Sequence, residues 1–158
     1  MGQVMRDESA ITSEPCYPCR MRVWSGQTEK EITAALRIDA SLTSTDTRAR
    51  YIAAVAARGG LRLIEDQAQV VGFCCLDDRY FFEKLFISLL VVDAGARRRG
   101  IGKELLEAAA LEHSEVWTST NRSNIAMRGL LAKIGWTFCG EIAGLDAGDP
   151  ELLFKKED

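Results

Sequence analysis

The chain has 158 residues, a length that corresponds to one domain with a short extension. A composition of 47% hydrophobic and 27% charged residues, with 3 prolines, is typical of a globular protein and excludes a fully disordered chain. The net charge of -3 argues against a protein that holds nucleic acid through bulk positive charge, while a local basic patch stays open.

The N-terminal segment, residues 1–18, mixes charged residues, Ser and Pro without periodicity, which predicts a flexible extension before a single domain at residues 19–158. It contains no apolar secretion signal, and the longest apolar run, residues 85–92, is too short for a membrane helix, so we expect a cytoplasmic protein with no membrane partner. The 5 cysteines, an odd number, favour reduced thiols over a disulfide framework. Cys16 and Cys19 are spaced like a redox or zinc half-site but lack the flanking elements and further ligands, so no metal is expected.

Hydrophobic periodicity predicts the order of elements in the domain. The predicted ranges are a strand at 21–24, a helix at 29–38, a second helix that ends at 57 after a cap at Ser44 or Thr45, strands at 61–65 and 69–76 around a turn at Asp66 and Gln67, a long strand at 81–92, a helix from Gly100, a strand at 115–118, a helix at 123–133, and strands at 137–142 and 152–155. This order predicts an α+β, or mixed α/β, fold around one sheet.

Residues 90–103, LVVDAGARRRGIGK, carry the clearest chemical signal: a strand runs into a glycine-containing turn and then a helix. Backbone N–H groups at a helix start lack internal partners and lie at the positive end of the helix dipole, so they favour phosphate. Arg97, Arg98, Arg99 and Lys103 add positive charge. The segment therefore predicts an anion-binding loop, and the alternative is a plain helix start with solvated arginines.

Two common phosphate-binding motifs do not fit this loop. A Walker A loop needs Ser or Thr after Gly-Lys and a Gly five residues before the second Gly, but Glu104 and Arg97 occupy these positions. A dinucleotide-binding fingerprint needs a third glycine where the chain has Leu105.

With these residues the chain resembles the GNAT superfamily of acyl-CoA-dependent N-acetyltransferases. The family's cofactor loop reads Arg/Gln-x-x-Gly-x-Gly/Ala after a strand ending in Leu-x-Val, and residues 97–102 and 90–92 match both parts. A second family block, an Asn followed about eleven residues later by Gly and an aromatic residue, matches Asn124, Gly135 and Trp136. The resemblance implies a GNAT-like central, mostly antiparallel twisted sheet of about six to seven strands flanked by about four helices.

The resemblance also implies that acetyl-CoA is the acyl donor. The loop amides would hold the pyrophosphate of coenzyme A, and the strand end would bind the pantetheine like an added strand, where the sheet splays open with a bulge. The amide of Val92 or Val91 would polarise the thioester carbonyl. The residues expected to bind the cofactor are Leu90, Val91, Val92, Arg97, Arg98, Arg99, Gly100, Ile101, Gly102, Lys103, Asn121 and Asn124.

The acceptor implied by the resemblance is an amine, which attacks only after losing its ammonium proton. Glu83, on the predicted long strand, is the first candidate for the base, and Asp77 and Asp78 follow; each could equally be a solvated carboxylate. Two acidic loops, residues 39–46 and 146–151, would attract a cationic amine if they are not ordinary turns. The aromatic residues at 81, 82 and 86 could line an apolar part of the acceptor pocket or belong to the core.

The chain departs from the family at the residue that commonly protonates the leaving thiolate. This residue is a Tyr in many members, and Leu131 occupies its place. A thiol with a pKa near 8.5 can leave without an acid, and Asn121, Ser123 or Ser119 could donate a hydrogen bond to the sulfur.

Three functions follow from these residues. The first is an N-acetyltransferase that acts in a ternary complex on a primary amine, either a small molecule or a protein Lys or N-terminus. The second is a catalytically silent acyl-CoA-binding or regulatory module. The third is a phosphate-binding interaction domain, which the net charge and the lack of interleaved aromatic residues disfavour, so no nucleic-acid partner is expected. A homodimer is consistent with the resemblance.

Overall fold

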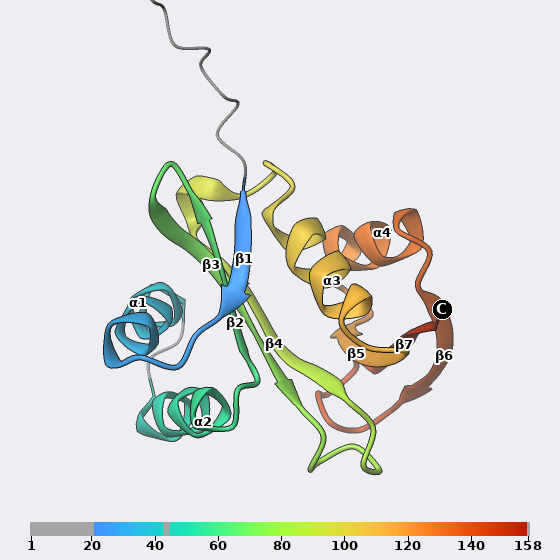
Figure 1. Ribbon diagram of the computed structural model, residues 1–158. Helices are drawn as coiled ribbons and strands as arrows, with labels where there is room; N and C mark the ends of the chain where they lie inside the picture. The colour runs from blue at the N-terminus through green and yellow to red at the C-terminus, as the bar shows by residue number, and fades with distance from the viewer. Residues whose placement is uncertain (1–20, 43–44, 158) are drawn as a thin grey trace, which may run out of the picture.

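The structure, a computed structural model, describes residues 21–42 and 45–157. These residues form one seven-stranded sheet in the order β1-β2-β3-β4-β5-β7-β6, with α1 and α2 on one face and α3 and α4 on the other (Figure 1). The strands are β1 (Arg22–Ser25), β2 (Leu61–Asp66), β3 (Gln69–Asp77), β4 (Phe86–Val92), β5 (Glu115–Asn121), β6 (Thr137–Ile142) and β7 (Glu151–Glu157), and the helices are α1 (Glu29–Ala40), α2 (Asp46–Ala57), α3 (Ile101–Leu111) and α4 (Ile125–Lys133).

The predicted α+β class with a mostly antiparallel sheet is confirmed. Neighbouring strands pair antiparallel, and the β4–β5 pair is parallel. The predicted N-terminal extension, Cys16 and Cys19 lie outside the described residues. None of the helices in the described part of the chain is long and apolar enough to cross a bilayer.

Local capping explains where the first two helices begin. Thr28 Oγ1 accepts a hydrogen bond from the backbone N–H of Glu31, and the Glu31 carboxylate accepts one from the backbone N–H of Thr28, so the two residues form a capping box for α1. Thr45 caps α2 by accepting from the backbone N–H of Arg48 at 3.2 Å. The other candidate cap, Ser44, lies outside the described residues.

Two sequence-based predictions about the central strands are wrong. The β2–β3 turn lies at Gln67 and Ala68, both in the left-handed region, one residue later than predicted. The predicted long strand begins only at Phe86, because Phe82 and Glu83 have φ values of 50° and 58° and the chain turns back there. Residues 78–85 therefore form a loop.

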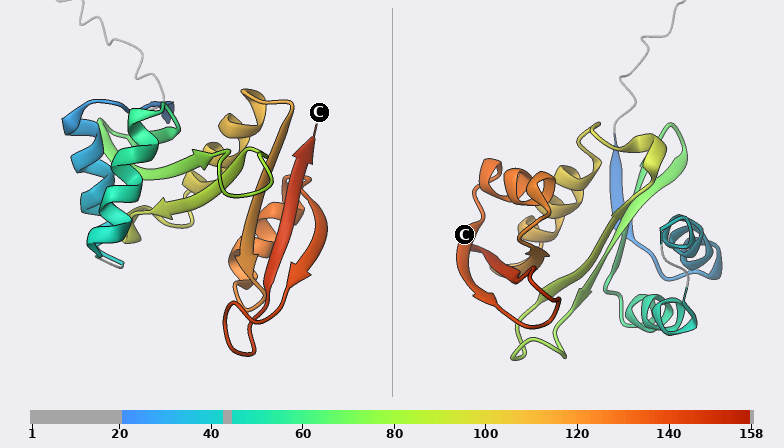
Figure 2. Two further views of the ribbon diagram at one scale, coloured as in Figure 1. Left: turned by 90° about the horizontal axis from the view of Figure 1, so that it is seen from below. Right: turned by 180° about the vertical axis from the view of Figure 1, so that it is seen from behind.

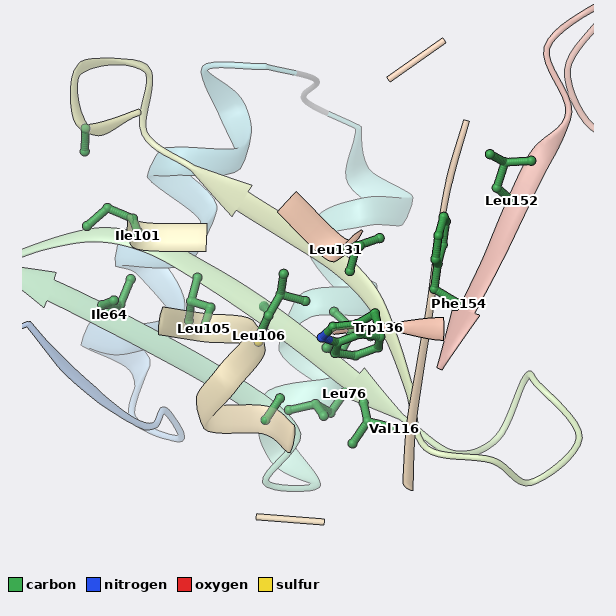
Figure 3. Packing of buried hydrophobic residues seen from close by; sticks show 14 residues of the cluster. Ile64, Leu76, Ile101, Leu105, Leu106, Val116, Leu131, Trp136, Leu152 and Phe154 are labelled. Carbon is green, nitrogen blue, oxygen red and sulfur yellow. The ribbon is translucent and has the colours of Figure 1, made fainter. Parts of the chain in front are cut away.

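Two hydrophobic clusters cover the two faces of the sheet. Under α3 and α4, buried side chains from the sheet and both helices pack together (Figure 3). Under α1 and α2, a second cluster contains Phe73, Leu89 and Val91. Cys74 is buried in the first cluster and Cys75 in the second, and burial raises the pKa of the Cys74 thiol to about 12 and that of Cys75 further. These two thiols are therefore inert core residues.

The sheet opens between β4 and β5. The parallel pairing covers Phe86 with Trp117 and Ile87 with Thr118, and beyond these pairs β5 and β7 run at a steep angle to β3 and β4 (Figure 2). β4 also carries a bulge, because Leu76 pairs with Ile87 while Cys75 pairs with Leu89.

Candidate functional site

A groove of about 610 Å³ lies between the end of β4, the start of α3 and the side of α4. Its lining includes every residue that the sequence predicted to bind the cofactor except Arg99 and Asn121. The lining residues are Leu42, Leu90, Val91, Val92, Arg97, Arg98, Gly100, Ile101, Gly102, Lys103, Asn124, Ala126, Met127 and Leu130.

Four lining residues were not predicted. Ala126, Met127 and Leu130 follow helical spacing on α4, so this face of the helix could have been found from its periodicity. Leu42, which follows α1, reaches the groove through tertiary folding, and nothing in the local sequence indicates this.

The loop between β4 and α3 exposes the backbone N–H groups at the start of α3 to the groove. A short 3-10 turn, η1 (Ala94–Ala96), begins where the Asp93 carboxylate accepts from the backbone N–H of Gly95 at 3.0 Å. Arg98 and Gly100 then adopt φ values of 60° and 85°, which reverse the chain into α3. Gly100 is the N-cap and has no side chain to cap the helix, so the amides of the first turn open to the groove.

The three consecutive arginines have different surroundings. Arg97 and Arg98 line the groove, and Arg97 Nε donates to the carbonyl of Val92 at 3.4 Å. Arg99 turns away and forms an ion pair with the carboxylate of Asp66 at the β2–β3 turn. The structure thus places Arg99 as a brace between the loop and the hairpin, and not in the groove as the sequence predicted.

The edge of β4 presents alternate backbone groups to the opening of the sheet. The N–H of Asp93 donates to the carbonyl of Val71 at 2.8 Å, so the backbone groups of Asp93 face β3. Because these directions alternate along a strand, those of Val91 also face β3, whereas those of Leu90 and Val92 face the opening. An extended ligand could bind there as an added strand.

Of the three predicted hydrogen-bond donors, Asn121 at the end of β5 and Ser123 just after it are engaged by the β6–β7 loop, whereas Ser119 lies within β5. Asn121 Nδ2 donates to Asp146 Oδ2 at 2.8 Å, and Ser123 Oγ donates to Asp149 Oδ2 at 2.6 Å. The side-chain and backbone hydrogen bonds from Ser123 lower the pKa of Asp149. Asn124, by contrast, lines the groove and caps α4 by accepting from the backbone N–H of Met127 at 3.1 Å.

The candidate bases are differently placed from the prediction. Glu83 is exposed in the 78–85 loop and not on the strand, because its backbone adopts the left-handed region. Asp77 is buried and forms ion pairs with Arg58 at 3.0 Å and Arg79 at 3.2 Å. Burial opposes ionisation of Asp77, but the hydrogen bonds and charge of Arg79, with the charge of Arg58, lower its pKa. Asp78 is exposed next to this pair.

The first of the two predicted acidic loops does not form as expected. α1 continues to Ala40, and Asp39 is buried, where its carboxylate accepts a hydrogen bond from Arg48 Nε at 2.7 Å. This ion pair joins α1 to α2, so Asp39 is a structural residue. In the second loop, Asp146 is exposed.

Of the aromatic residues in the 78–85 loop, Phe81 packs against β4 and β5. The Phe81 ring centroid lies 4.8 Å from that of Phe86 and 5.4 Å from that of Trp117. Phe82 is 87% exposed. Phe81, Phe86 and Trp117 thus form an aromatic cluster next to the point where β4 and β5 separate.

The position of the family's Tyr faces the core. Leu131 is fully buried in the cluster under α3, beside Leu106 and Trp136 (Figure 3). Within residues 21–42 and 45–157, no three His, Cys, Asp or Glu side chains come together in a way that could hold a metal ion.

Comparison with known proteins agrees with the fold. The profile of the Acetyltransferase (GNAT) family matches residues 24–136. An acetyltransferase of the GNAT family from Bacillus cereus ATCC 10987 superposes with a TM-score of 0.80 at 27% identity, over 88% of this chain and 98% of that one.

Two more distant structures share the fold. The ribosomal-protein-S18-alanine N-acetyltransferase from Escherichia coli has a TM-score of 0.69 at 15% identity, over 87% of this chain and 94% of that one. The protein yncA from Salmonella typhimurium, solved with its cofactor acetyl-CoA, has a TM-score of 0.66 at 17% identity, over 87% of this chain and 93% of that one. No curated protein matches the chain.

Proposed function

The chain belongs to the GNAT acetyltransferase family, and from this premise we propose that it transfers the acetyl group of acetyl-CoA to a primary amine within a ternary complex. The observation that carries the proposal is the groove, which combines the amides of the first turn of α3, two arginines and the free edge of β4. The acceptor is a small-molecule amine or a protein Lys or N-terminus.

The residues of the groove fit coenzyme A. The N-terminus of α3 with Arg97, Arg98 and Lys103 supplies N–H donors and positive charge for the pyrophosphate. A Cβ placed on Gly102 would lie 3.5 Å from Leu90 and 3.6 Å from Leu130, which are both lining residues, so this glycine keeps the groove open. The mostly apolar α4 side suits the pantetheine arm.

The edge of β4 supports a role in transfer. When bound, acetyl-CoA supplies an activated thioester. Val91 and Val92 were the two candidates for the amide that polarises the thioester carbonyl. The N–H of Val92 points into the opening of the sheet, as that of Leu90 does, whereas the N–H of Val91 points toward β3. This supports Val92 in that role. The amide C–N bond forms as the C–S bond breaks, sulfur keeps the bonding pair, and the proton lost by the amine balances the proton that the thiolate takes up.

Thermal denaturation tests the cofactor assignment. Acetyl-CoA and coenzyme A at about 100 times their dissociation constants should each stabilise the chain by about 2.7 kcal/mol, whereas ATP and NAD should have little effect. Release of free thiol is then followed with N-α-acetyl-lysine amide, an alanyl peptide and 1,4-diaminobutane. No stabilisation by either coenzyme A species would refute the proposal.

The alternative function is a silent acyl-CoA-binding module, which the burial of Leu131 in place of the family's Tyr favours. This alternative predicts stabilisation by acetyl-CoA with no amine-dependent release of thiol. The two measurements together therefore separate the two functions.

A further inference from the structure

The bulge in β4 brings an extra side chain to the α1–α2 face of the sheet. Ile87 and Leu90 pack in the cluster under α3, and Leu89 packs in the cluster under α1 and α2. Ser88 is the residue added between the Leu76–Ile87 and Cys75–Leu89 pairs. As a result Ser88 and Leu89 both face α2, and Ser88 is exposed on that face.

Ser88 is held there by a tyrosine of α2. The Tyr51 and Ser88 hydroxyl oxygens lie 2.5 Å apart, and Ser88 Oγ donates to the carbonyl of Cys75 at 3.3 Å. We assign the Ser88 proton to the Cys75 carbonyl, an assignment in which Ser88 accepts the hydrogen bond from Tyr51. Burial raises the pKa of Tyr51 to about 12, while its hydrogen bond with Ser88 acts in the opposite direction, so the phenol stays protonated at neutral pH.

This hydroxyl pair lies at the point where the sheet opens. Ile87 and Thr118 form the last pair between β4 and β5, and Ser88 is the next residue of β4. Leu90, which lines the cofactor groove, is two residues further along the same strand, about 7 Å away at strand spacing. Most of the groove lining comes from the α3–α4 side, with Leu42 and Val91 from the other side, and the exposed Ser88 hydroxyl lies on the α1–α2 side of the same strand.

We propose that Ser88 binds the nitrogen of the acceptor amine and that Tyr51 is the positioning residue that holds Ser88 in place, an assignment that rests on the proposed function. A serine oxygen that already accepts from Tyr51 has a second lone pair free for an N–H donor. An amine that enters from the α1–α2 face meets this oxygen at the apex of the opening. The neutral amine then donates an N–H to Ser88 and directs its own lone pair across the strand.

Two conjugates of coenzyme A test this contact without turnover. In one, S-carboxymethyl coenzyme A is joined through an amide to n-butylamine; in the other it is joined through an ester to n-butanol. The two conjugates differ at one position, which carries N–H in the amide and oxygen in the ester. Calorimetry gives the ratio of the ester and amide dissociation constants for the wild type and for S88A, S88T, Y51F and Y80F.

The wild type should bind the amide about tenfold more tightly than the ester, which corresponds to one hydrogen bond. S88A should bring the ratio to about one, S88T should restore it, and Y51F should lower it to about threefold. S88A and the double variant with Y51F should give the same ratio, because Tyr51 acts through Ser88. Y80F is the matched control, because the hydroxyl of Tyr80 accepts a hydrogen bond from Arg79, whereas that of Tyr51 contacts Ser88. Y80F should therefore keep the wild-type ratio.

The outcomes separate this proposal from the proposed function. If the wild type binds amide and ester equally, or if S88A keeps the tenfold ratio, the role of Ser88 is refuted while the cofactor groove stands. Equal losses in Y51F and Y80F would refute the positioning role of Tyr51. If neither conjugate nor coenzyme A binds the wild type, the cofactor assignment itself is wrong, and the role of Ser88 fails with it.

Discussion

Replacement of Gly102 by Ala should raise the stability of the chain and weaken its cofactor binding. Gly102 lies in the first turn of α3, and its added Cβ would meet Leu90 at 3.5 Å, Leu130 at 3.6 Å and Val92 at 3.9 Å, which are ordinary contact distances. Gly-to-Ala changes in helices stabilise by up to about 1 kcal/mol, which raises the Tm of a chain of this size by about 2–4 °C.

The same methyl group projects into the wall of the groove beside the helix amides. Displacement of an anion by enough to lose one charge-assisted hydrogen bond costs about 1.5–3 kcal/mol, or roughly ten- to a hundredfold in Kd for acetyl-CoA. G129A is the matched control: Gly129 lies within α4, and a Cβ there would meet nothing within 4 Å. G129A should raise the Tm similarly and leave affinity unchanged.

Thermal scans and calorimetry with acetyl-CoA measure both effects in the same three proteins. If G102A binds acetyl-CoA as tightly as the wild type and G129A does, the assignment of the first turn of α3 to the cofactor is wrong. If G102A loses affinity because it is misfolded, its Tm falls instead of rising, so the two explanations are distinguished.

Three further substitutions test other parts of the structure. D66N removes the partner of Arg99 and should raise the Kd for acetyl-CoA by about threefold in calorimetry, with less than about 1 kcal/mol lost in urea denaturation because the Arg99 side chain is half exposed. D77N should cost about 1–3 kcal/mol at pH 7. Because the folded pKa of Asp77 is lowered, its contribution is complete above the unfolded value of about 3.9 and is lost as the pH falls through the lower folded pKa, so the difference in urea denaturation between wild type and D77N should begin to shrink below about pH 4. L131Y should overpack the core by about 1–3 kcal/mol, lower the Tm, and fail to raise the rate of thiol release, since that position faces the core; a faster variant would contradict this placement.

The sequence predicted the features that depend on local chemistry. The turn into α3 is one of these, because Gly100 adopts the left-handed conformation that a non-glycine residue resists and the helical periodicity begins directly after it. The cap at Thr45 is another, because its side chain bonds to an amide three residues away. Both signals lie within a few residues of the feature they specify.

The start of β4 was mispredicted for a tertiary reason. Aromatic residues at 81 and 82 favour a strand by intrinsic preference. In the structure Phe81 packs onto Phe86 and Trp117, and Trp117 comes from β5, more than 30 residues later in the chain. The loop conformation therefore depends on a contact that a local window does not contain.

The partners of charged side chains were the least predictable feature of the site. Arg97, Arg98 and Arg99 are equivalent in the sequence, but Arg99 alone reaches Asp66, which is 33 residues away on the neighbouring hairpin. Asp39 likewise resembles an exposed loop carboxylate until α1 extends past it and buries it against Arg48. Such pairings depend on the packing of elements, so composition and spacing carry little information about them.

The burial of Leu131 changes what the site must supply for acetyl transfer. A thiol with a pKa near 8.5 is a good leaving group and can depart as the thiolate without a dedicated acid. An alkyl amine with a pKa near 10.4 is mostly protonated at neutral pH, so the scarce species is the neutral nucleophile. Under the proposed function, the supply of neutral, correctly oriented amine therefore limits the reaction more than protonation of sulfur does. For this reason we expect loss of the proposed Ser88 contact to slow thiol release more than the absence of an acid on α4 does.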